Sequence, residues 1–117
     1  MDGALLSIVA SLVVAGVAWY VAWAGRRRAL PKNALLGIRT RSTTRTDAGW
    51  YAAHQAAAPY NVLAGIWFLV GGLLAGLVGD RGGERATILA SAWAIALVQV
   101  AAAVVVAGRA ARAVDGE

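Results

Sequence analysis

Residues 4–24 read ALLSIVASLVVAGVAWYVAWA, an apolar run without a charged side chain. At about 1.5 Å of rise per residue, a helix of this length reaches roughly 30 Å, the thickness of the hydrocarbon core of a bilayer. Two further apolar runs follow, over about residues 56–79 and 86–108. Because a backbone in lipid must satisfy its own hydrogen bonds, each run is expected to form a helix. The sequence therefore predicts an all-α membrane protein with three transmembrane helices in a single membrane domain, residues 1–117.

The composition also indicates lipid as the surroundings of the chain. Of the 117 residues, 60% are hydrophobic and only 15% are charged, and the mean hydropathy is +0.64. The apolar residues run almost unbroken, whereas a soluble domain shows them in periodic stripes with polar residues between. The chain has no cysteine, which excludes disulfides, thiolate metal sites and a cysteine nucleophile.

The basic residues predict the orientation in the membrane. The connection between the first two runs and the C-terminal tail together hold most of them: Arg26, Arg27, Arg28, Lys32, Arg39, Arg41 and Arg45, then Arg109 and Arg112. The connection at 80–85 holds Arg81 and Arg85, balanced by Asp80 and Glu84. The positive-inside rule places the long connection and the C-terminus in the cytoplasm and the N-terminus outside. We therefore interpret the net charge of +5 as a topology signal and expect no nucleic-acid binding.

The long connection contains the most polar stretch of the chain, NALLGIRTRSTTRTDAGWYAAH at residues 33–54. Thr46 or Asp47 can cap a helix, so the second membrane helix is expected to have a cytoplasmic extension that begins at about residue 47. Trp50 and His54 are four residues apart and share one face of that extension. They form either part of a site or an interfacial aromatic anchor beside a solvated histidine.

A family resemblance is carried by the motif in this stretch. In order, its residues are Pro31-x-Asn33-x-x-x-Gly37-x-Arg39-Thr40-x-x-Thr43, followed by Trp50-x-x-x-His54. The motif resembles the signature of the SdpI-like family of small bacterial membrane proteins, named after an immunity protein that protects its producer from a secreted peptide toxin. The resemblance implies a multi-pass protein of the bacterial cytoplasmic (inner) membrane that protects against, or senses, a membrane-active peptide. It marks as candidate motif or binding residues Asn33, Gly37, Arg39, Thr40, Thr43, Trp50 and His54.

The residue types of the motif suggest a compact turn at the membrane surface. Gly37 permits a left-handed backbone, and the side chains of Asn33 and Thr43 can bond to nearby backbone groups. Arg39 offers a planar fork of donors to a carboxylate, a lipid phosphate or carbonyl oxygens. We expect a loop whose Arg39 and Thr40 meet the face of Trp50 and His54. Alternatively, Arg39 and the neighbouring arginines only bind anionic headgroups, at roughly 1 kcal/mol each.

Three residues within the membrane spans are candidates for helix packing. Gly72 and Gly76 form a GxxxG pair that permits close helix contact, inside the bundle or in a homo-oligomer. Gln99 lies near the middle of the third helix and should not face lipid, because its amide would remain unsatisfied there. We expect it to bond across the bundle, to Ser7 or Ser11.

The sequence gives little sign of enzyme chemistry. The spans contain no acidic residue, the single histidine has no metal partner at a recognised spacing, and no catalytic triad or phosphate-binding loop is present. We expect no catalytic residue, metal or cofactor. Two functions remain: self-protection from a membrane-active peptide, or an accessory subunit of a larger membrane complex. The expected partners are membrane lipids, with a peptide toxin, another membrane protein or further copies of the chain beside them.

Overall fold

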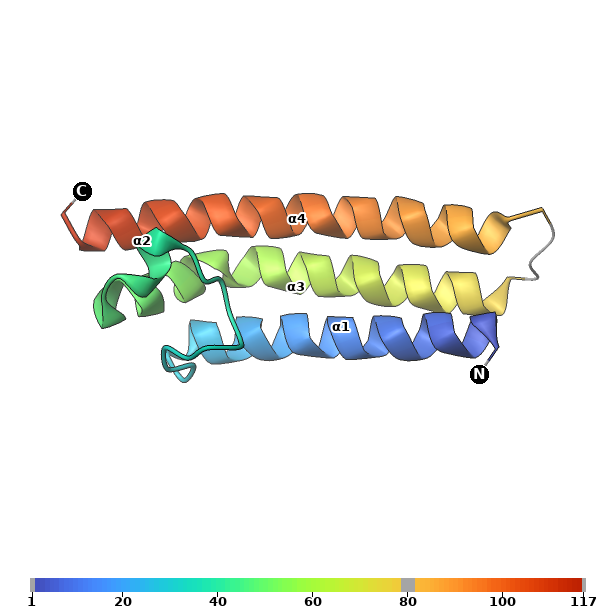
Figure 1. Ribbon diagram of the computed structural model, residues 1–117, viewed down its shortest axis with the longest axis horizontal. Coiled ribbons are helices and arrows are strands. Elements are labelled where there is room, and N and C mark those ends of the chain that lie inside the picture. Colours follow the sequence, from blue (N-terminus) through green and yellow to red (C-terminus); the bar gives the residue numbers. More distant parts are fainter. Residues whose placement is uncertain (1, 79–81, 117) are drawn as a thin grey trace.

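The computed structural model describes residues 2–78 and 82–116, and these fold as helices joined by short connections (Figure 1). The long helices are α1 (Gly3–Arg26), α3 (Asp47–Leu77) and α4 (Glu84–Val114), and α2 (Arg41–Thr44) is a single turn. All three long helices are long and apolar enough to cross a membrane. No strand occurs within the described ranges. The predicted all-α class and the three membrane-spanning helices are thus confirmed.

Side-chain caps explain where two of the long helices begin. The Asp2 carboxylate accepts a hydrogen bond from the Leu5 amide at 2.8 Å and starts α1. The Thr46 hydroxyl accepts from the Gly49 amide at 2.9 Å, which makes Thr46 the cap of α3 and places Asp47 in its first turn. The second membrane helix therefore has the predicted extension from residue 47.

The helix α3 lies between α1 and α4 and packs along both of them (Figure 1). The structure is an elongated rod with principal extents of 54 × 21 × 19 Å. The connection of residues 27–46 lies at the same end as the C-terminal end of α4, and α1 begins at the other end (Figure 1). The predicted end of the second span at Gly79 and the charged pair Asp80 and Arg81 lie outside the described residues.

Small residues form the contacts between helices, and large apolar residues point outward. One core cluster joins α3 and α4 entirely through alanines: Ala53, Ala57, Ala103, Ala107 and Ala111. Exposed large side chains include Leu6, Leu12, Val13, Leu74 and Val98. Small residues let helix backbones approach closely, which is the usual way of packing helices in lipid. A face of leucine and valine needs no cover when the solvent is hydrocarbon.

The glycine pair of α3 faces α1. A Cβ at Gly72 would collide with the side chain of Ser11, and one at Gly76 would collide with the side chain of Ile8. The GxxxG pair therefore packs inside the bundle, against the N-terminal end of α1. Because glycine has no side chain, the backbones of α1 and α3 can approach closely there.

The expected cross-bundle bond of Gln99 does not form with Ser11. The hydroxyl of Ser11 has no hydrogen-bond partner, and that of Ser7 donates to the Gly3 carbonyl oxygen at 2.7 Å within its own helix. Gln99 is half-buried on α4. The prediction for Ser11 was wrong because hydropathy places a residue within a span but fixes neither its rotation nor its depth relative to the neighbouring helix.

Candidate functional site

The first half of the 27–46 connection is a turn organised by Asn33. Its side-chain oxygen accepts from the amides of Leu35 and Leu36 at 2.8 and 2.7 Å. Its side-chain nitrogen donates to the carbonyl oxygens of Pro31 and Leu36 at 2.9 and 3.2 Å. Asparagine side chains commonly replace backbone groups in this way. The Arg39 guanidinium donates to the backbone carbonyl of Asn33 and ties the end of the turn to its start.

The second half is the short helix α2, held by two threonines. The Thr40 hydroxyl accepts from the Thr43 amide at 3.3 Å, and the Thr43 hydroxyl accepts from the Thr40 amide at 2.9 Å. This reciprocal pair is a capping box. The Thr43 side chain is fully buried, and its hydroxyl donates to the Ile38 carbonyl oxygen at 2.6 Å. Thr43 thus connects α2 to the residue that follows Gly37.

Trp50 and His54 on α3 form the floor beneath this loop. Both are fully buried, and their rings lie 4.1 Å apart between centroids. The Trp50 indole N–H donates to the Leu30 carbonyl oxygen at 2.7 Å. The Ile38 amide donates to Nε2 of His54 at 2.8 Å, and Nδ1 of His54 lies 2.8 Å from the Trp50 carbonyl oxygen. Since Nε2 accepts, the imidazole is neutral and carries its proton on Nδ1.

Two glycines allow backbone to approach this histidine from both sides. Gly37 has a φ of +102°, and a Cβ there would lie 2.6 Å from Nε2 of His54 and 3.0 Å from the Trp50 ring. A Cβ at Gly25, in the last turns of α1, would lie 2.9 Å from both Cβ and the carbonyl oxygen of His54. Glycine is therefore required at 37 for its conformation and at both positions for space.

The structure brings the seven predicted motif residues into one connected unit but differs from the expected contact. The loop reaches the face of Trp50 and His54 through Gly37 and Ile38. The side chain of Arg39 is exposed and bonds within the loop. The alternative of a solvated histidine beside an interfacial tryptophan is wrong, because neither side chain has exposed surface.

Residues outside the motif fasten the loop to the helices. The Lys32 ammonium lies 3.6 Å from the Asp47 carboxylate and donates to the Thr44 carbonyl oxygen at 3.2 Å. Two further bonds reach the end of α4: Arg112 donates to the Ser42 hydroxyl at 3.3 Å, and the Thr46 hydroxyl donates to the Asp115 carboxylate at 2.7 Å. Neither these partners nor Ile38 could be identified from the sequence, because a backbone amide and long-range polar pairs carry no local pattern.

Most polar groups of the motif form hydrogen bonds within the loop or to α3, and the basic side chains lie at the surface. A hollow of about 380 Å³ lies beside the turn, lined by Lys32, Asn33, Ala34, Arg39 and Thr44. Arg28 lies over the ring of Tyr51, with its guanidinium carbon 4.9 Å from the ring centroid. The arrangement fixes the positions of positively charged side chains at the level where the headgroups of a membrane would lie. Within the described residues, it shows neither a paired acid and base nor an activated nucleophile.

Comparison with known proteins finds a family model that matches most of the chain. The model of the SdpI/YfhL protein family matches residues 29–108, which include the folded loop, all of α3 and most of α4. No curated protein and no solved structure matches the chain. The family match begins beside Leu30, which bonds Trp50, and contains every residue of the loop motif. The chain therefore belongs to the SdpI/YfhL protein family.

Proposed function

We propose that this membrane protein gives its cell self-protection against a membrane-active peptide, by binding or sensing that peptide in the bilayer. The observation that carries the proposal is the family match over residues 29–108 together with the complete, folded motif around His54. A protein built mainly from lipid-facing helices meets its ligand from within the membrane. No reaction is part of this proposal, and no metal or cofactor is required by it.

The proposal includes an orientation in the bacterial cytoplasmic membrane. Most basic residues belong to the 27–46 connection and its flanks or to the last turns of α4, and these lie at one end of the rod (Figure 1). The positive-inside rule assigns that end to the cytoplasm. The N-terminus and the connection between α3 and α4 then face outside. A peptide that attacks from outside first meets the end where α1 begins.

The accessory-subunit alternative receives less support from the packing. Such a subunit would use Gly-rich and Ala-rich faces to bind its partners, but Gly72 and Gly76 already pack against α1. The alanines shared by α3 and α4 are likewise buried within the bundle. A partner protein would have to bind faces of leucine and valine that lipid covers equally well.

A deletion strain tests the protective function directly. Cells that lack the gene should grow poorly in spent medium from their own stationary-phase culture, and the wild-type gene should restore growth. A variant with a disrupted loop, Gly37→Ala, should fail to restore it, while the matched variant Gly16→Ala in α1 should succeed. Normal growth of the deletion strain in spent medium and in purified membrane-active peptides would contradict the proposed function.

Single cysteines test the orientation, since the chain has none of its own. Gly82→Cys lies in the connection before α4 and should react with an impermeant thiol reagent in intact cells. Ser42→Cys lies in α2 and should react only after the cells are permeabilised. The reverse labelling pattern would invert the topology and move the loop motif to the outer face.

A further inference from the structure

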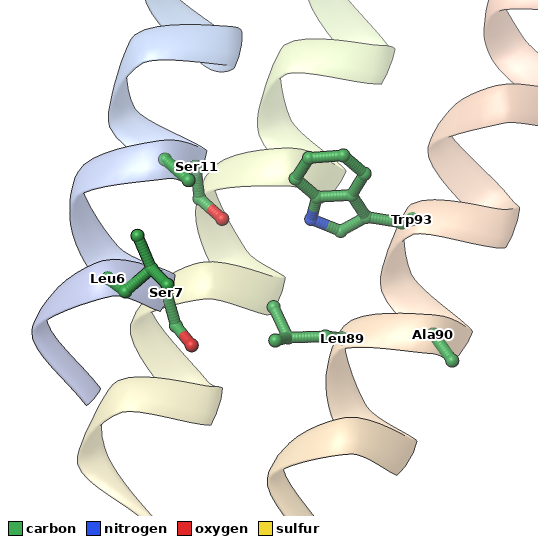
Figure 2. Close-up of a pocket in the computed structure, with 7 residues that line it drawn as sticks. Leu6, Ser7, Ser11, Leu89, Ala90 and Trp93 are labelled. Carbon is green, nitrogen blue, oxygen red and sulfur yellow. The ribbon is translucent and has the colours of Figure 1, made fainter. Parts of the chain in front are cut away.

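A hollow of about 390 Å³ opens between α1 and α4 toward the end where α1 begins. Its walls include Leu6 and Ala10 of α1 and Leu89 and Ala90 of α4, so they are almost wholly apolar. Three polar side chains, those of Ser7, Ser11 and Trp93, also line it. Figure 2 shows the ring nitrogen of Trp93 on the side of the indole that faces α1, and the Ser11 hydroxyl lies against Gly72 of α3.

Neither of these polar atoms has a hydrogen-bond partner. The Ser11 side chain is 1% exposed, and its hydroxyl and the indole N–H of Trp93 are both unpaired. The neighbouring Ser7 is different, because its hydroxyl is satisfied by the Gly3 carbonyl oxygen. Buried polar groups are nearly always paired, and in lipid no bulk water can replace the missing partner. The Ser11 hydroxyl can turn into the hollow by rotation about one bond.

A second hollow of about 440 Å³ continues along the same face toward the loop end. It is lined by Val14 and Val21 of α1, by Val100 of α4 and by Asn61 of α3. Ser11, Val14, Ala18 and Val21 follow one another at spacings of three or four residues, so the two hollows share one stripe of α1. Trp93 and Val100, seven residues apart, share a stripe of α4 in the same way.

The second hollow holds a third unpaired donor. Asn61 is 8% exposed, and its side-chain nitrogen has no partner. The three unpaired groups, Ser11 O–H, Trp93 N–H and Asn61 N–H, can all donate, so each places a partial positive charge beside an otherwise apolar groove. The complementary ligand is apolar along its length and carries acceptor oxygens at the two levels where the donors lie.

The spacing and depth of the donors exclude a small headgroup and a phospholipid chain as the ligand. Ser11 packs against Gly72, and Asn61 precedes Gly72 by eleven residues on the same helix, which corresponds to about 16 Å along the groove. A single ring or headgroup cannot span that distance. Ser11 is also about 12 Å from the start of α1, well below the level of phospholipid ester groups. At that depth, phospholipid chains offer only methylene groups.

We infer that the groove between α1 and α4 binds a membrane-inserted peptide segment that carries two hydrogen-bond acceptors about eleven residues apart. The inference rests on the proposed function, in which a membrane-active peptide is the ligand, and adds the site and the chemistry of recognition. One acceptor meets Ser11 and Trp93, and the other meets Asn61. Polar side chains between apolar helices are a common means of association in lipid.

The test uses the full-length protein in lipid nanodiscs and a synthetic probe. The probe is a leucine helix with lysine ends, a fluorescent label and two glutamate γ-methyl esters eleven residues apart, since an ester accepts but does not donate. A helix of leucine alone is the reference peptide. Each hydrogen bond between membrane helices contributes about a threefold change in affinity, so three bonds predict that the ester probe binds about twentyfold more tightly than the reference.

Matched variants test whether the three donors are responsible for the binding. Ser11→Ala and Trp93→Phe should each weaken binding of the ester probe about threefold and leave the leucine helix unaffected. Ser91→Ala serves as the control, because Ser91 lines a different hollow, on the side of α4 near Trp67 and Ile95. A probe with its esters five residues apart can bond at only one of the two levels and should bind about threefold more weakly than the matched probe. Asn61→Leu, which removes the donor of the second hollow, provides an independent variant should Trp93→Phe fail to fold.

The outcomes separate this inference from the proposed function. The site would be overturned if the ester and leucine probes bound equally, or if binding were unchanged in all three variants. A trapped water molecule would then be the hydrogen-bond partner of the donors. If wild-type protein protects cells and a Ser11→Ala, Trp93→Phe double variant protects them equally, the site fails while the proposed function stands. If wild-type protein gives no protection but distinguishes the probes, the proposed function fails and the site stands.

Discussion

Replacing Gly37 by alanine should release the loop from α3. The residue has a φ of +102°, and the added Cβ would lie 2.6 Å from Nε2 of His54, the atom that accepts the Ile38 amide. Holding a side chain in the left-handed region costs about 1–2 kcal/mol. Losing the bond to His54 and leaving its partner unpaired costs about 1–3 kcal/mol. A combined penalty of about 3 kcal/mol raises the population of the open loop about 150-fold.

Amide hydrogen exchange at Ile38 measures this opening directly. Protein labelled with ¹⁵N in detergent micelles should show exchange at Ile38 that is about 150-fold faster in Gly37→Ala, or at the unprotected rate if that limit comes first. The control is Gly16→Ala, a position in α1 where an added Cβ meets nothing within 4 Å. There alanine favours the helix by about 1 kcal/mol, and exchange at Ile38 should not change. If both variants exchange at the wild-type rate, the loop does not depend on its contact with His54.

The remaining predictions concern the arginine of the loop and the glycines beneath α1. Arg39→Lys keeps the charge but loses the planar fork that bonds the Asn33 carbonyl, so loop opening should increase about fivefold, or about 1 kcal/mol, in the same exchange measurement. Arg26→Lys should leave the exchange rate at Ile38 unchanged. If Arg39→Lys also leaves it unchanged, the Arg39 side chain has only a role in binding headgroups. Replacing Gly72 and Gly76 together by leucine should lower thermal stability in detergent, because each side chain forces α3 away from α1 at a cost of about 1–3 kcal/mol. An unchanged melting temperature would contradict the close packing.

The long helices could be predicted because hydrophobic length is a local property of the chain. The predicted start of the α3 extension at residue 47 agrees with the Thr46 cap, which follows from residue type and position alone. The third helix, predicted to end near residue 108, continues to Val114. Its last turns are not in the apolar run, but Ala111 is buried against the α3 extension, so tertiary contact prolongs the helix. Hydropathy cannot detect such an extension.

The loop was harder to predict because its decisive contacts involve backbone. The sequence indicates that Asn33, Gly37 and Thr43 shape a turn, but the group that meets His54 is the amide of Ile38, which every residue except proline possesses. The one-turn helix α2 was not predicted, because its capping box has threonine at the position where glutamate or glutamine is usual. The guanidinium chemistry of Arg39 favours it as a site residue in the sequence. In the structure, Gly37 brings the loop against His54 because it has no side chain.

The folded loop links the motif to the groove in the membrane. Ile38 donates its amide to His54, and its side chain lines the same hollow as Asn61. Leu35, Leu36 and Gly37 line that hollow as well, so the loop forms the wall at this end of the groove. The polar groups of the motif therefore hold this wall in place, and the residues with unpaired donors line the groove that the wall closes. On this reasoning, opening the loop through Gly37→Ala should weaken binding of an inserted peptide even though no donor has been removed.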